Sequence, residues 1–186
     1  LNDKEAIDGF ELNISCPNVK KGGITFGTDP LLISKITMKV KKAVGDKCLI
    51  VKLTPTVTDI SVTARAAVEA GADALSLVNT FTAMKIDIET HKPVLANRTG
   101  GLSGPAIKPM AVYLVNRVYK EVKKNTNVPI LGMGGIRNAA DAVEFMIAGA
   151  SAVGIGTANF IQPDCGEKII DGLEKYFQQK NISEIK

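Results

Sequence analysis

Two carboxamides, a hydroxyl and a thiol are concentrated in the segment Asn13-Ile14-Ser15-Cys16-Pro17-Asn18. The run before it, Gly9-Phe10-Glu11-Leu12, predicts a strand, and Pro17 ends that strand because proline has no N–H for a ladder bond. In a parallel α/β barrel, the carboxyl ends of the strands form the face that carries the active site. We therefore predict that the Cys16 thiol is an acid–base group beside a planar polar substrate, which the carboxamides bind.

Polar residues also stand at the ends of the next two predicted strands. Lys52 lies within the apolar run Ile50-Val51-Lys52-Leu53-Thr54, where its burial is costly unless it meets an anion or an acceptor. Two interpretations of Lys52 stay open: it binds an anionic ligand, or it is a rim lysine paired with a carboxylate. Asn79-Thr80 follows the third strand and places a further amide at the same rim.

Two glycine-rich turns follow the last two predicted strands. They are Gly132-Met133-Gly134-Gly135-Ile136 and Gly154-Ile155-Gly156-Thr157. Barrels commonly bind a phosphate on backbone N–H groups at this position, and glycine lets the backbone approach it closely. Neither turn has the pattern of a P-loop or of a dinucleotide-binding fingerprint. A cofactor that carries a phosphate is the prediction.

The elements that must position these residues follow from short apolar runs that alternate with amphipathic stretches, a pattern typical of βαβ units and a parallel sheet. The predicted strands are residues 10–15, 48–53, 74–78, 129–132 and 152–155, and the predicted helices are residues 30–44, 59–70, 105–124, 139–148 and 164–179. Asp59 and Asn138 are expected to cap their helices, and Gly71 and Gly149 to follow helix ends.

Five strands are fewer than the eight of a TIM (β/α)₈ barrel, which typically needs about 250 residues. The chain begins at Leu1 and reaches a strand almost at once. Either it forms an open five-stranded α/β sheet, or it is the C-terminal part of a barrel. We favour the second, with residues 1–186 as a single α/β-barrel domain of about five βα units that lacks its N-terminal strands.

Two glycine-rich segments lie between the predicted elements. Residues 20–28 directly follow the thiol and are interpreted either as a lid with glycine hinges or as a disordered surface loop. Residues 97–105 follow the third strand and lead into a helix that starts near Pro105. Loops this rich in glycine usually move or press against a ligand.

Composition excludes several function classes. The chain has 186 residues, 45% of them hydrophobic and 23% charged, with a net charge of +4 and only 5% aromatic residues. The lysines are spread over predicted helix faces rather than clustered with aromatics, so nucleic-acid binding is not expected. No run of about 18 apolar residues predicts a membrane span. Three cysteines without a CxxC motif suggest neither disulfides nor a zinc site, and His91 is read as a loop residue.

Seven motifs, in this order along the chain, resemble those of the class 1 dihydroorotate dehydrogenases, and most closely the NAD-linked class 1B catalytic subunit. The motifs are Asn13-Ile14-Ser15-Cys16-Pro17-Asn18, residues 22–30, Val51-Lys52-Leu53, Val78-Asn79-Thr80, residues 100–109, Gly132-Met133-Gly134-Gly135 and Ile155-Gly156-Thr157. The resemblance implies an FMN-containing TIM barrel that oxidises dihydroorotate to orotate in pyrimidine synthesis.

The resemblance also implies a role for each candidate residue. Cys16 would be the general base that removes the C5 proton, while the C6 hydride passes to the flavin. Substrate would be bound by Asn13, Asn18, Asn79 and Thr80, and the flavin and its phosphate by Asn13, Lys52, Val78, Gly104, Gly134, Gly135, Gly156 and Thr157. Of these, Lys52 would stabilise the anionic reduced ring. No metal is implied.

By the same resemblance, the protein is expected to be a cytoplasmic homodimer that pairs with an electron-transfer subunit carrying FAD and a 2Fe–2S cluster. The family's N-terminal strands, with a further flavin lysine and further substrate asparagines, have no counterpart before Leu1. Three alternatives stay open. The first is a dihydropyrimidine dehydrogenase-like reductase, although such an enzyme would need a cysteine in residues 19–30. The second is an inactive phosphate-binding barrel fragment, and the third is a phosphate-binding isomerase or aldolase barrel.

Overall fold

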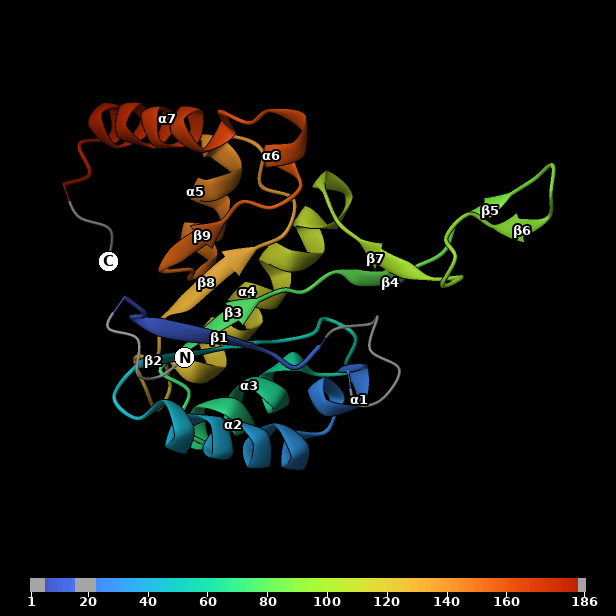
Figure 1. Cartoon of the computed structure of the whole chain (residues 1–186). Helices are drawn as coiled ribbons and strands as arrows, with labels where there is room; N and C mark the ends of the chain where they lie inside the picture. Colours follow the sequence, from blue (N-terminus) through green and yellow to red (C-terminus); the bar gives the residue numbers. More distant parts are fainter. Residues whose placement is uncertain (1–5, 16–22, 184–186) are drawn as a thin grey trace.

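The computed structural model describes residues 6–15 and 23–183, which form a parallel sheet with its connecting helices (Figure 1). The strands of this sheet stand in the order β1-β2-β3-β8-β9, and every neighbouring pair is parallel. Their bounds are β1 (Gly9–Asn13), β2 (Cys48–Lys52), β3 (Ala74–Leu77), β8 (Ile130–Met133) and β9 (Ala152–Gly154). Each predicted strand is present, with its ends shifted by no more than two residues.

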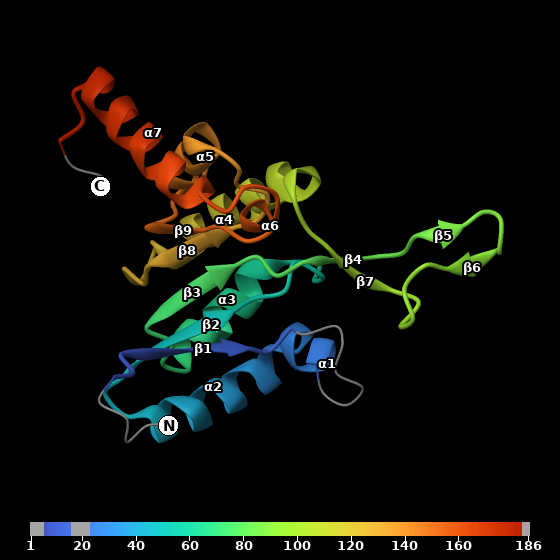
Figure 2. The ribbon, with the colours of Figure 1, turned by 45° about the horizontal axis from the view of Figure 1, so that its top comes forward.

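Four helices that connect these strands, and one that follows the last strand, lie in a row, and Figure 2 shows the arrangement from a second direction. Their bounds are α2 (Pro30–Val44), α3 (Ile60–Glu69), α4 (Lys108–Val122), α5 (Ala139–Ala148) and α7 (Cys165–Lys180). Contacts join α2 to α3, α3 to α4, α4 to α5, and α5 to α7. The predicted alternation of strands and helices is confirmed.

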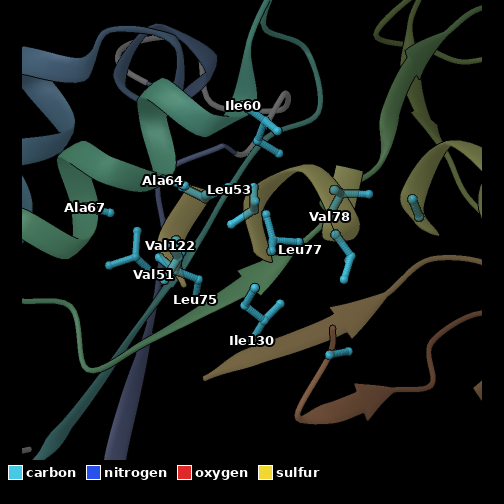
Figure 3. Close-up of a cluster of buried hydrophobic side chains, with 14 of the residues drawn as sticks. Val51, Leu53, Ile60, Ala64, Ala67, Leu75, Leu77, Val78, Val122 and Ile130 are labelled. Carbon is cyan, nitrogen blue, oxygen red and sulfur yellow. The ribbon is translucent and has the colours of Figure 1, made fainter. Parts of the chain in front are cut away.

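The core lies between the sheet and this row of helices (Figure 3). The strands contribute Val51, Leu75 and Leu77, while α3 contributes apolar residues at helical spacing such as Ile60 and Ala64; all are almost completely buried. Because successive residues of a strand face opposite sides of the sheet, Lys52 and Ser76 face away from this cluster. The register pairs Asn13 with Lys52 and Lys52 with Ser76, so polar side chains form a row across that other face.

Helix ends follow the predicted capping residues. The Asp59 carboxylate accepts a hydrogen bond from the N–H of Ser61 at 3.0 Å, and the Asn138 side chain accepts one from Asp141 at 2.9 Å. Gly149 has a φ of 114° at the end of α5, a left-handed conformation that favours glycine. These caps fix where α3 and α5 begin, and hence how the strand-to-helix turns before them are placed.

The connection between β3 and α4 differs from the glycine-rich loop that the sequence predicts. β4 (Phe81–Ala83) pairs with β7 (Gly100–Leu102), and β5 (Ile86–Asp87) pairs with β6 (Lys92–Pro93), both antiparallel. Together they form an arm that projects from the sheet (Figures 1 and 2). Strands of two or three residues are too short for a period-2 pattern to be recognised. After the arm, η1 (Pro105–Ile107) leads into α4.

The segment interpreted as a glycine-hinged lid is partly helical. Residues Gly23–Thr28 form α1, which contacts α2, while residues 20–22 lie outside the described part of the chain. Gly27 is buried, and a Cβ atom there would lie 2.9 Å from the Ile14 carbonyl oxygen. Gly27 therefore serves close packing between α1 and the end of β1 instead of a hinge.

The lysines that were assigned to solvated helix faces are largely exposed, including Lys39 and Lys42 on α2 and Lys120 on α4. His91 is exposed between β5 and β6, as predicted. Among the described residues, no helix combines the length and the apolar character that crossing a membrane requires. In that same part of the chain, no group of three or more His, Cys, Asp or Glu side chains is arranged to hold a metal ion.

Candidate functional site

An open cavity of about 450 Å³ lies at the carboxyl ends of the strands. Its size falls within the range of roughly 300–1,000 Å³ that is usual for small-molecule sites. The predicted site residues among its lining are Lys52, Val78, Asn79, Thr80, Gly104, Gly134, Gly135, Gly156 and Thr157. Residues that are more than one hundred positions apart in the sequence thus meet around one space.

The parallel sheet explains this convergence. Lys52 is the last residue of β2, and residues 78–80 follow β3 directly. The pairs 134–135 and 156–157 follow β8 and β9, while Gly104 immediately precedes η1. Since all five strands run in one direction, every one of these turns opens at the same edge.

A hydrogen-bond network joins the end of β1 to the turn after β3. Asn79 Nδ2 donates to Ser15 Oγ at 2.8 Å and lies 3.2 Å from Asn13 Oδ1. Ser15 Oγ is in turn 3.2 Å from Asn13 Oδ1, and Asn79 Oδ1 accepts from the N–H of Thr80 at 2.9 Å. Ser15 is 2% exposed, so the network fixes the backbone immediately before Cys16. No described residue accepts a hydrogen bond from Asn13 Nδ2.

Two predicted residues, Cys16 and Asn18, lie outside the described part of the chain. The roles predicted for them, general base for Cys16 and substrate binding for Asn18, stay predictions. Asn13 is not part of the cavity lining, but its contact with Asn79 connects it to a residue that is.

Lys52 has a carboxylate partner. Its Nζ atom lies 3.1 Å from Glu11 Oε1, and the two side chains are 20% and 33% exposed. The contact expected from the second interpretation, a rim lysine paired with a carboxylate, is therefore present. Lys52 also lines the cavity, so the interpretation that it binds an anionic ligand stays open. Glu11 was not among the predicted site residues, although it shares a face of β1 with Asn13.

The two glycine turns present a group of unpaired N–H donors. Within the described residues, the backbone N–H groups of Gly134, Gly135, Gly156 and Thr157 donate to no acceptor. Unpaired N–H groups that line a cavity form a ready-made binding site for an anion. Thr157 Oγ1 also donates to Ser103 Oγ at 2.8 Å, which ties the turn after β9 to the segment before η1.

The glycines of these two turns differ in why glycine is found at each position. Gly134 and Gly135 have φ values of 133° and 83°, and a Cβ at Gly135 would lie 2.7 Å from the Gly104 carbonyl oxygen. Packing within the protein therefore already requires glycine at position 135, and the predicted close approach of this turn to a phosphate stays a prediction. At Gly156, an added Cβ would meet nothing within 4 Å, so this position faces open space.

A partly buried cluster of charged side chains supports the turn after β8. Lys108 Nζ lies 2.7 Å from both Asp141 Oδ1 and Glu144 Oε1, and the N–H of Arg137 donates to Asp141 Oδ2 at 2.9 Å. Burial raises the pKa of Asp141, but hydrogen bonds from Lys108 and Arg137 outweigh it and leave that pKa below its usual value. The hydrogen bonds that Lys108 donates to Asp141 and Glu144 raise the pKa of Lys108. The cluster connects the start of α4 to α5.

The sequence as a whole agrees with the resemblance that these residues suggested. A sequence model described as "Dihydroorotate dehydrogenase" matches residues 3–177, which is nearly the whole chain. The chain belongs to the dihydroorotate dehydrogenase family.

Curated members of the dihydroorotate dehydrogenase family are identical to this chain at about half of the aligned positions. The chain is 54% identical over 180 residues to "Dihydroorotate dehydrogenase B (NAD(+)), catalytic subunit" of Alkaliphilus metalliredigens, and 51% identical over 185 residues to the protein of that name from Pelobacter propionicus. The alignments cover 97% and 100% of this chain but 58% and 59% of those relatives. The predicted resemblance to the class 1B catalytic subunit is confirmed, and the chain spans somewhat more than half the length of these relatives.

Solved structures of dihydroorotate dehydrogenases (DHODH) are also similar. A ligand-free DHODH from Eimeria tenella matches with a TM-score of 0.78 and 27% identity, over 96% of this chain and 54% of that chain. The complex of DHODH with ferulenol from the same organism matches with a TM-score of 0.76 and 28% identity. The predicted fold class, an α/β protein that forms part of a TIM barrel, is confirmed.

Sequence reasoning missed the apolar part of the cavity lining. The cavity is also lined by Ser103, Ile107, Met133, Ile155 and Phe160. Ile155 and Met133 are adjacent to predicted glycines, so position alone was a signal for them. Ile107 and Phe160 lie on η1 and on α6 (Ala158–Ile161), whose placement at the cavity depends on tertiary packing. The site thus combines apolar side chains, N–H donors and a lysine.

Proposed function

We propose that the protein built on this chain oxidises dihydroorotate to orotate in de novo pyrimidine (UMP) synthesis, with FMN as its cofactor. One observation carries the proposal: the cavity brings the predicted flavin residues and the amide corner of Asn79 to one edge of a sheet. The supporting comparison is the identity of about half the residues to proteins named as catalytic subunits of dihydroorotate dehydrogenase B.

The chemistry of the cavity fits FMN. The unpaired N–H groups of the turns after β8 and β9, together with Gly104, would hold its phosphate. Apolar side chains such as Ile107 and Met133 suit the flat ring, and Val78 would touch it through its backbone. FMN, when bound, supplies a hydride acceptor. Lys52 would stabilise negative charge on the reduced ring, since an amine 3.1 Å from Glu11 is held at the cavity wall.

Substrate binding is assigned to the carboxamides. Asn13, Asn18, Asn79 and Thr80 would hydrogen-bond the amide-like edges and the carboxylate of dihydroorotate. A site built on such bonds discriminates strongly, because analogues that lack a partner leave buried polar groups unpaired. Cys16 would accept the C5 proton as general base, which requires a thiol with only a modestly lowered pKa. The Asn13–Ser15–Asn79 network would hold the chain just before Cys16 in place.

Electrons are proposed to leave through a partner. The relatives' name, "catalytic subunit", supports a second subunit, which we infer carries FAD and a 2Fe–2S cluster and passes electrons to NAD. We also propose a homodimer, located in the cytoplasm, whose contacts involve the arm of β4–β7. Apolar side chains are exposed along that arm: Met84, Ile86, Ile88, Val94, Leu95 and Leu102.

The proposal is tested by the anaerobic flavin spectrum before and after dihydroorotate is added. The chain is assayed alone and completed with the part of the Alkaliphilus metalliredigens relative that it does not match. Bleaching of the visible flavin band by dihydroorotate, and not by dihydrouracil, is the expected result. Bleaching by dihydrouracil instead would favour a dihydropyrimidine dehydrogenase-like reductase. If neither form retains flavin, the proposal is wrong and a non-catalytic phosphate-binding barrel becomes the better description.

A further inference from the structure

Asn159 lies directly behind the turn after β9 and donates to its backbone. Its Nδ2 atom lies 2.7 Å from the Ile155 carbonyl oxygen and 3.2 Å from the Gly156 carbonyl oxygen. The backbone N–H of Asn159 donates to the same Gly156 oxygen at 3.1 Å. One side chain therefore holds two successive carbonyl groups of residues 154–157, the turn that lines the cavity.

The orientation of the Asn159 amide is set by Cys165. Cys165 begins α7 and is 2% exposed, and its Sγ atom lies 3.2 Å from Asn159 Oδ1. A thiol is a weak donor that suits a carbonyl-type acceptor. With Oδ1 directed at the thiol, Nδ2 must face the two carbonyl groups, since reversing the amide would bring oxygen against oxygen.

This arrangement determines where the N–H groups of the turn point. In a planar trans peptide, the C=O and the N–H point in opposite directions. Because the carbonyl groups of Ile155 and Gly156 are directed at Asn159, the N–H groups of Gly156 and Thr157 are directed away from it. These are two of the donors that find no acceptor among the described residues.

We infer that Asn159 and Cys165 are positioning residues that hold the 154–157 turn in the conformation that binds the cofactor phosphate. The inference rests on the proposed function, because it takes the phosphate of FMN as the ligand of the turn. Neither Asn159 nor Cys165 lines the cavity; Asn159 acts through the backbone of residues 155 and 156, and Cys165 acts through Asn159.

The test compares the dissociation constants of FMN and riboflavin, which differ only in the phosphate. Asn159→Leu keeps a similar shape and removes the donor. It is expected to weaken FMN about tenfold, as the loss of one or two hydrogen bonds of about 1 kcal/mol each predicts, and to leave riboflavin unchanged. Cys165→Ala should weaken FMN about threefold, whereas Cys165→Ser, which keeps a donor, should bind FMN like the unmodified protein.

Asn116→Leu is the matched control. Asn116 Nδ2 also donates to a backbone carbonyl, that of Ala148 at 3.2 Å, but Asn116 does not line this cavity. Its substitution should change neither constant. Equal weakening of FMN and riboflavin by Asn159→Leu, or no weakening by both Asn159→Leu and Cys165→Ala, overturns the inference while the flavin site stands. If the unmodified protein, completed as above, does not prefer FMN to riboflavin, the proposed phosphate site fails and the inference fails with it.

Discussion

Gly135 and Gly156 line the same cavity, but substitution by alanine should affect them differently. At Gly135 it should lower the stability of the protein, and at Gly156 it should weaken FMN binding. Gly135→Ala introduces a Cβ at a φ of 83°, 2.7 Å from the Gly104 oxygen and 3.0 Å from Lys108 Cβ. The left-handed conformation costs an L-residue roughly 1–2 kcal/mol, and overpacking adds roughly 1–3 kcal/mol. We expect the free energy of unfolding to fall by about 2–5 kcal/mol, a large part of a typical total of about 5–15 kcal/mol.

Gly156→Ala should instead leave stability within about 1 kcal/mol, because the added Cβ meets nothing within 4 Å. If the phosphate lies against this turn, however, the methyl group occupies its place. Hydrogen bonds to a charged group contribute about 1.5–3 kcal/mol, so the FMN dissociation constant should rise roughly 10- to 100-fold.

Urea unfolding followed by circular dichroism measures the first effect, and titration of flavin fluorescence measures the second. The two glycines control for each other, since each variant adds one methyl group to a turn of the same cavity. Wild-type FMN affinity in Gly156→Ala would show that the turn after β9 does not hold the phosphate. Wild-type stability in Gly135→Ala would refute the packing argument.

Three further predictions concern the Cys16 thiol, the partly buried Lys108–Asp141 ion pair and the arm. Cys16→Ala should leave FMN bound but slow its reduction by dihydroorotate about 100-fold or more in stopped-flow absorbance, and an unchanged rate would remove Cys16 from the mechanism. Burial by itself raises the pKa of Asp141, but hydrogen bonds from Lys108 and Arg137 outweigh it and lower this pKa below its unfolded value of about 3.9. The contribution of its bridge to Lys108 is therefore complete above about pH 4 and lost as pH falls through the lowered folded value. Below about pH 4, the free energy of unfolding should therefore depend less steeply on pH for Asp141→Asn than for wild type. Parallel curves of unfolding free energy against pH for the two proteins would contradict this prediction. Finally, Ile88→Lys, at a residue 79% exposed on the arm, should shift mass photometry from dimer toward monomer without lowering the melting temperature, and an unshifted dimer would exclude this part of the arm as its interface.

The sheet could be predicted because its pattern is local. Apolar runs such as Cys48–Lys52 and helix caps such as Asp59 can be recognised from neighbouring residues alone. Because parallel strands end at one shared edge, the predicted sheet then brings Lys52 and Asn79 together. The arm could not be predicted, since β5 and β6 are two residues each and their pairing is decided by the turn between them.

The parts of the site that escaped prediction depend on contacts between distant elements. Lys108 and Asp141 are 33 residues apart, and nothing near either residue in the sequence indicates that they meet. The contact of Cys165 with Asn159 could not be predicted either, because a lone cysteine at a helix start carries no signal of its partner. The packing of Gly135 against Gly104, a residue of another turn, could not be predicted either, and the predicted role of Gly135 in holding a phosphate stays a prediction.

Lys52 shows why two interpretations of one residue need not compete. Its pair with Glu11 is partly exposed, and such pairs contribute only about 0–1 kcal/mol. A partner this weak keeps the long side chain at the cavity wall without committing its charge, so the amine remains free to turn toward an anionic ligand at small cost. Glu11 belongs to the face of β1 that also carries Asn13. Glu11 therefore stands beside the candidate site through its contact with Lys52, although it does not line the cavity.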